Sequence, residues 1–218
     1  MDLRTLIRDL YGIDRPQGCT AEEITAMRKS FGTIPPVLED FWRIAGHTDE
    51  VHFNQDDWLF PEDFQKSGYM TRFEDLRLFC ENQACCWAGI RRKDLTLPDP
   101  PVYTQESEDE PWLLSAPTTS AFLEAALTYE AAWRLPYRPA AFFELSDGDL
   151  SVIRAKLEQR PCALDNWMGM NLTFYSNRPD NLVVLMDMDG EYQAIYGGAT
   201  RESYEALLEV MEGLGEPV

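Results

Sequence analysis

The fold is decided by residues 171–197, NLTFYSNRPDNLVVLMDMDGEYQAIYG. β-Branched and aromatic residues gather in three runs and predict strands over 171–176, 181–187 and 191–197. The two connections consist mainly of Asn, Asp, Pro and Gly, which suit tight hairpin turns. Strands joined by hairpins pair antiparallel, so this stretch predicts an antiparallel sheet and argues against alternating strand–helix–strand units.

Helical and extended patterns occupy separate parts of the remaining chain. Apolar residues at helical spacing, bounded by Gly and by capping residues, predict helices over 3–11, 20–31, 38–45, 118–134, 149–159 and 200–212. Further strands are expected over 57–60, 73–80, 84–90 and 101–104. This segregation indicates an α+β fold in which helices surround a mostly antiparallel central sheet. We expect a single domain over 1–218, with the acidic stretch at 105–111 as the best candidate boundary.

The chain is strongly acidic, with 38 Asp and Glu against 19 Lys and Arg and a formal net charge of −19. Phosphate backbones and anionic membrane surfaces would repel it, so we expect neither a nucleic acid nor a membrane as partner. A basic protein is the natural partner, because opposite fields speed encounter. The acidity could equally serve solubility alone.

Cysteine use and the N-terminus indicate the cytoplasm. The five cysteines are odd in number and include the adjacent pair Cys85 and Cys86, which could bridge only with strain. No CxxC occurs, so reduced thiols packed as small apolar groups are expected. The first residues lack the apolar core of a signal peptide, and no apolar run is long enough for a membrane span.

Catalytic and metal-binding patterns are weak. The two histidines, His47 and His52, are five residues apart, so they lack the HExxH spacing that directs both rings at one zinc ion. A loop could still gather them with Asp49 around a metal, but surface histidines are the simpler interpretation. Neither Cys86 nor Cys162 has an evident base nearby in sequence. Residues 187–190 read as a hairpin turn, because the third acidic ligand and the distal Glu of a calcium loop are missing.

Several segments together resemble the SUKH superfamily of bacterial immunity proteins and fungal cell-wall-synthesis regulator domains. They are FGTIPP at 31–36 with the helix that ends at Gly46, ENQACCWAGI at 81–90, DPPVY at 99–103, and Trp112 with SAFL at 120–123. The family often has Gly after ENQ, whereas this chain has Ala84, so a backbone conformation that needs glycine is not expected there.

The resemblance implies a single α+β domain without catalytic residues whose bacterial members neutralise toxins by tight binding. Many such toxins act on nucleic acid and tend to be basic, which fits the charge of this chain. We therefore expect a cytoplasmic immunity protein with no cofactor and no metal. The expected contact surface is the acidic loop formed by Glu106, Glu108, Asp109 and Glu110.

Two alternatives remain open at this point. The first is a regulatory or scaffolding domain that binds a protein unrelated to any toxin. The second is a hydrolase that uses a metal or a cysteine and depends on His47, His52 or Cys86.

Overall fold

The structure is a computed structural model that describes residues 2–66, 68, 73 and 75–218. Its N-terminal part is helical. The helices are α1 (Leu3–Tyr11), α2 (Ala21–Phe31), α3 (Pro36–Ala45), α4 (Asp49–His52) and α5 (Pro61–Lys66).

Local sequence signals define the ends of these helices. α1 ends at Gly12, which adopts the left-handed conformation (φ 71°) and donates its N–H to the last turn. α2 begins at the capping box predicted for Thr20 and Glu23, in which each side chain accepts from the other residue's backbone N–H. The first three predicted helices are confirmed, whereas the two short helices α4 and α5 were not predicted.

A five-stranded antiparallel sheet follows, in the order β1-β2-β3-β4-β5. Its strands are β1 (Asp57–Trp58), β2 (Leu76–Cys80), β3 (Trp87–Ile90), β4 (Val102–Gln105) and β5 (Leu113–Ala116). Strands were expected at the first four places, with longer bounds for the first three, and residue 74 of the second lies outside the described residues. The edge strand β5 was missed, because it has only four residues and lies between the acidic loop and the next helix cap, Thr118.

The prediction for Ala84 is wrong. Residues 82–85 form the turn between β2 and β3, so the strand expected over 84–90 begins at Trp87. Within this turn Ala84 has φ 60°, a left-handed conformation that disfavours every side chain relative to Gly. The backbone therefore does adopt the conformation for which glycine is best suited. Backbone N–H groups of Gln83 and Cys85 donate to the buried carboxylate of Glu81 and hold the turn in this shape.

A second antiparallel sheet has the order β11-β6-β10-β9-β8-β7. Its strands are β6 (Phe143–Leu145), β7 (Glu158–Trp167), β8 (Met170–Ser176), β9 (Asn181–Met188), β10 (Glu191–Gly198) and β11 (Glu216–Pro217). The three hairpin strands predicted within 171–197 are β8, β9 and β10, and both predicted turns are confirmed. The predicted helix over 149–159 is α7 (Asp147–Lys156), and it ends early because Leu157 is extended and leads into β7.

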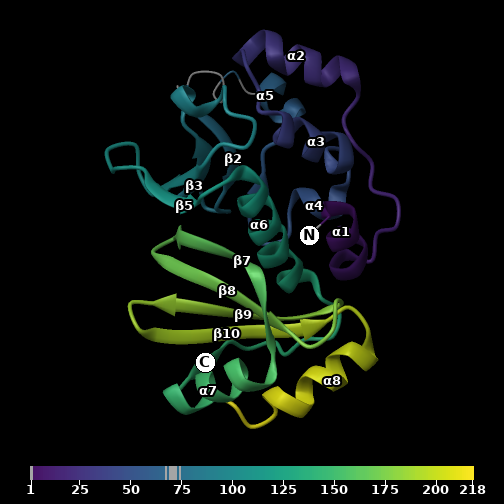
Figure 1. Cartoon of the computed structure of the whole chain (residues 1–218), viewed down its shortest axis with the longest axis vertical. Coiled ribbons are helices and arrows are strands. Elements are labelled where there is room, and N and C mark those ends of the chain that lie inside the picture. Colours follow the sequence, from purple (N-terminus) through teal and green to yellow (C-terminus); the bar gives the residue numbers. More distant parts are fainter. Residues whose placement is uncertain (1, 67, 69–72, 74) are drawn as a thin grey trace.

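The long helix α6 (Thr119–Arg134) lies between the two sheets (Figure 1). Phe79 of β2 contacts Phe122 of α6 and Trp167 of β7, with ring centroids 6.2 Å and 4.9 Å apart. The main apolar core is therefore shared by both sheets and by the N-terminal helices. α7 and α8 (Arg201–Met211) cover the other face of the six-stranded sheet and bury a second apolar cluster.

These elements confirm the α+β class and the antiparallel pairing of the strands. The strands form two sheets where one central sheet was expected. None of the helices that the structure describes combines the length and the apolar character needed to cross a bilayer.

Candidate functional site

The acidic loop connects the paired strands β4 and β5, so a domain boundary there would cut a sheet. All four predicted contact residues, Glu106, Glu108, Asp109 and Glu110, are exposed. The loop is held from inside by Gln105, whose Nε2 donates to the carbonyl oxygens of Glu108 (3.4 Å) and Glu110 (2.6 Å). The four carboxylates are therefore presented by a loop with an internal anchor.

Exposed apolar side chains lie beside these carboxylates. Leu113 and Leu114 on the edge strand β5 are each 49% exposed, and Met168 in the turn between β7 and β8 is 38% exposed. Asn166, near the end of β7, donates its Nδ2 to Leu114 O at 2.9 Å, which joins this end of β7 to the edge strand β5. Large exposed apolar groups next to charged groups are typical of protein-binding surfaces.

The acidic loop, the β7–β8 turn and the β2–β3 turn lie close together. A Cβ atom placed on Gly169 would lie 3.8 Å from Glu106 Oε1, which puts the loop against the β7–β8 turn. Glu106 also acts electrostatically on Cys85 of the β2–β3 turn. We call the exposed residues of 82–85, 106–110, 113–114 and 166–169 the three-turn surface. It was not foreseen as a unit, because its parts are distant in sequence.

Buried acidic side chains behind this surface hold its loops by hydrogen bonds. Glu130, in the middle of α6, is fully buried and accepts the backbone N–H groups of Asn54, Gln55 and Asp56 at 3.0–3.2 Å. Burial, followed by the charge of Asp56, raises the pKa of Glu130 to about 8. The carboxylate thus fixes a loop that has no regular structure of its own.

Asp56 extends this network of buried hydrogen bonds to the β2–β3 turn and to the end of β7. Its side chain accepts from Trp167 Nε1 at 3.0 Å and from the backbone N–H of Asn82 at 3.2 Å. Burial raises its pKa to about 6, although both hydrogen bonds act in the opposite direction. One buried side chain therefore ties the β2–β3 turn to the end of β7.

Glu81, the first residue of the ENQ motif, organises the β2–β3 turn. Its Oε2 accepts from the backbone N–H groups of Gln83 (2.8 Å) and Cys85 (3.3 Å), and from the Cys85 thiol at 3.0 Å. This last hydrogen bond is the main reason that the pKa of Cys85 is raised to about 11. The Glu of the ENQ motif thus fixes the conformation of the β2–β3 turn. The roles of Glu81, Asp56 and Glu130 were not predicted. For Glu130 alone the sequence offered a signal, a charged residue within an apolar helical face.

The histidine and cysteine residues considered for a hydrolase are not brought together. His52 stacks on Phe60 with ring centroids 4.1 Å apart, and its Nε2 lies 3.0 Å from Gly46 O. Cys86 is fully buried, and burial raises its pKa to about 12. A thiol held protonated in the core is a poor nucleophile. Its neighbour Cys85 is exposed.

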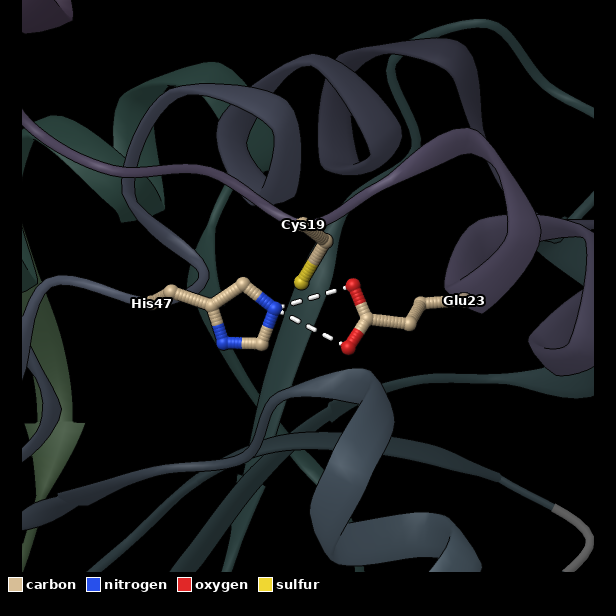
Figure 2. A group of neighbouring side chains, drawn as sticks. All are labelled: Cys19, Glu23 and His47. Atoms are coloured by element: carbon tan, nitrogen blue, oxygen red, sulfur yellow. Dashed lines mark hydrogen bonds and ion pairs between the residues drawn. The ribbon is translucent and has the colours of Figure 1, made fainter.

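His47 instead meets two residues that the sequence analysis did not connect with it. Its Nε2 lies 2.9 Å from both carboxylate oxygens of Glu23, and the Cys19 sulfur points toward the gap between them (Figure 2). One donor atom from each of the three side chains lies within 4.8 Å of the others. The hydrogen bond with His47, followed by that from Thr20, lowers the pKa of Glu23. In the part of the chain that the structure describes, this is the sole group of three metal-ligating side chains so close together.

Comparison with known proteins finds no family model, no curated protein and no solved structure that matches this chain significantly. The resemblance to the SUKH superfamily therefore remains a prediction from the quoted motifs.

Proposed function

We propose that this chain is a cytoplasmic, non-enzymatic immunity protein that neutralises a basic bacterial toxin by binding it at the three-turn surface. The observation that carries the proposal is the placement of four exposed carboxylates beside three exposed apolar side chains. A basic toxin that acts on nucleic acid presents the complementary charge. The SUKH-like motifs support the same class of protein.

The two chemical components of the surface have different tasks. Carboxylates at the rim attract a basic partner over several ångströms and thereby raise the association rate. Apolar side chains at the centre become desolvated in the complex and slow its dissociation. Leu113, Leu114 and Met168 are well placed for the second task, because neighbouring turns and strands hold their backbone.

The buried carboxylate network supplies the rigidity that tight binding needs. A surface whose loops are ordered before binding loses less conformational entropy on association. Glu130, Asp56 and Glu81 together hold 54–56 and 82–85 in place. The network thus serves recognition without a reaction of its own.

The first experiment is co-expression of the chain with each toxin encoded beside its gene. Protection and a stable complex are expected with one of them. If no neighbouring toxin is neutralised and none forms a complex, the proposal fails. A complex with a protein that is not a toxin would instead identify the regulatory or scaffolding alternative.

The second experiment separates the two components of the surface. Changing Glu106, Glu108 and Glu110 to Gln and Asp109 to Asn should lower the association rate by about tenfold or more at low salt, and should weaken its salt dependence. Changing Leu113 and Leu114 to Ser should mainly raise the dissociation rate. Stopped-flow or surface-based kinetics would measure both.

A matched control removes the same number of charges far from the three-turn surface. Glu202, Glu205, Glu209 and Glu212 are exposed on or just after α8, which covers the face of the six-stranded sheet that points away from α6. Changing these four to Gln should alter the association rate far less. If both quadruple variants slow association equally, net charge and not the acidic loop is responsible.

A further inference from the structure

We propose that Cys19, Glu23 and His47 bind one zinc ion. Their donor atoms are a sulfur, a carboxylate oxygen and an imidazole nitrogen, the three ligand types that zinc uses in proteins. They converge on a common point between α2 and the end of α3 (Figure 2). Three protein ligands leave a fourth tetrahedral position for water. This position can face solvent, because the side chains of His47 and Glu23 are 33% and 29% exposed.

The distances suit a small divalent ion. Ligand atoms around tetrahedral zinc lie about 3.4 Å apart, given bond lengths of about 2.0–2.3 Å. His47 Nε2 and the nearest Glu23 oxygen are 2.9 Å apart, so a few tenths of an ångström of separation would admit the ion. The sulfur already lies within 4.8 Å of both atoms. The ligands therefore need only small movements.

The backbone holds all three ligands in place. Cys19 N donates to Trp42 O at 2.8 Å, and His47 N donates to Gln17 O at 2.8 Å, so segment 17–19 runs along the end of α3. This close approach requires glycine at two positions. A Cβ atom on Gly46 would lie 2.2 Å from the Cys19 sulfur, and one on Gly18 would lie 1.8 Å from Arg43 O. The sulfur is thus packed directly against the α3 terminus.

The capping box orients the third ligand. Glu23 Oε2 accepts from Thr20 N at 2.7 Å and from Thr20 Oγ1 at 3.0 Å, and this holds the carboxylate with both oxygens 2.9 Å from His47 Nε2. Such hydrogen bonds to a ligating carboxylate fix its orientation and increase metal affinity. The helix cap predicted from the sequence therefore has a second role in holding a zinc ligand.

The charges at this place favour a cation. A Cys19 thiolate and the Glu23 carboxylate would together balance the two charges of zinc, so the bound site would be neutral. Glu62 and Asp63 of α5 lie close enough to act electrostatically on the Cys19 sulfur and add to the attraction. Binding breaks the S–H bond of Cys19, forms a sulfur–zinc bond and releases the proton to solvent.

Metal titration of the purified, chelator-treated chain tests the site. Cobalt(II) should bind in one equivalent and give the thiolate-to-cobalt charge-transfer band together with the visible bands of a tetrahedral ion. Zinc should displace it, because cobalt(II) loses ligand-field stabilisation when it moves from octahedral water to a tetrahedral site, whereas d10 zinc has none to lose. Cys19→Ser should lose the charge-transfer band. Glu23→Gln should weaken zinc binding by at least about tenfold, the loss typical even of outer-shell changes.

The variants are chosen so that folding and metal binding can be separated. Gln at position 23 can still complete a capping box, so Glu23→Gln removes a ligand while keeping the start of α2. Cys162→Ser and His52→Gln are matched controls at a buried cysteine and a histidine outside the cluster, and they should bind cobalt as the original chain does. The proposal is overturned if the folded chain gives no charge-transfer band, or if Cys19→Ser binds zinc with unchanged affinity.

Discussion

The part of the chain that forms the five-stranded sheet and the part that forms the six-stranded sheet are stabilised by polar contacts of different range. In the first, buried carboxylates join residues far apart in sequence: Glu130 binds a loop 74–76 positions away, and Asp56 binds Trp167, 111 positions away. In the second, the polar contacts are shorter in range: capping boxes join residues three positions apart, as at Ser146 with Asp149, and the buried Asn181 donates its Nδ2 to Ser203 O, 22 positions away.

This difference supports the proposal that the three-turn surface is the binding surface. Burying a carboxylate costs free energy unless its partners are well placed, so proteins seldom use one where a local cap would suffice. Here the costly network lies beneath the three-turn surface and holds its irregular turns. The hairpins and caps of the six-stranded sheet provide a stable support without such groups. Departures from the simplest stabilising solution are expected near functional sites.

The largest expected effect is on the free energy of unfolding, and it is measured by comparing a variant of the buried network with a variant of a helix cap. Glu130→Ala leaves the backbone N–H groups of the part-buried Asn54 and Gln55 and of the buried Asp56 without this acceptor, and should lower the free energy of unfolding by about 3–5 kcal/mol. Ser146→Ala removes one exposed cap and should cost about 1 kcal/mol. Urea-induced unfolding measures both values. Equal losses would mean that the two parts of the molecule do not differ as described.

The second largest expected effect is a free energy of unfolding that decreases as pH rises. The folded-state pKa values of Glu130 and Asp56 are raised to about 8 and about 6, from ordinary values of 4.5 and 3.8. The folded protein therefore holds more protons than the unfolded chain between these values, and stability is lost as the groups ionise. We expect Glu130→Gln to reduce this loss by roughly 2–4 kcal/mol between pH 4.5 and 8, measured by urea unfolding across that range.

In the six-stranded part, Asp149 contributes a pH dependence of stability with the opposite sign. Hydrogen bonds from Ser146, first from its side chain and then from its backbone, lower the pKa of Asp149. Its stabilising effect is present above the ordinary pKa and is lost only in acid. Asp149→Asn should therefore leave the slope between pH 6 and 8 unchanged. A flattened slope in this variant, or an unchanged slope in Glu130→Gln, would contradict the assignment.

The smallest expected effect concerns the backbone of the turns. Ala84→Gly should stabilise the protein by about 0.5–1 kcal/mol, because it removes a side chain from a left-handed position. Asp189, in the β9–β10 turn, also has positive φ (55°), but Asp tolerates this region and its side-chain neighbour Asp187 accepts from Gly190 N. Asp189→Gly should therefore change stability less. Thermal unfolding of both variants checks the ranking.

Elements defined by contacts between near neighbours in sequence were predicted, whereas elements that depend on distant contacts were missed. β8, β9 and β10 were predicted with bounds close to those observed, since hairpin turns and alternating side chains act between neighbours in the chain. β5 and β7 were missed, because each is short or irregular in pattern and depends on packing against the other. The acidic loop was identified as an exposed segment, but its apolar neighbour Met168 comes from a turn some sixty residues later.

The sequence by itself determined the α+β class, the hairpins, the helix caps and the strong negative charge, because these depend on composition and on contacts between near neighbours. Only the tertiary structure decided which distant residues meet: Glu130 with the loop at 54–56, the acidic loop with the β7–β8 turn, and Cys19 and Glu23 with His47. Such meetings depend on how helices and sheets pack, and packing is set by the whole core at once.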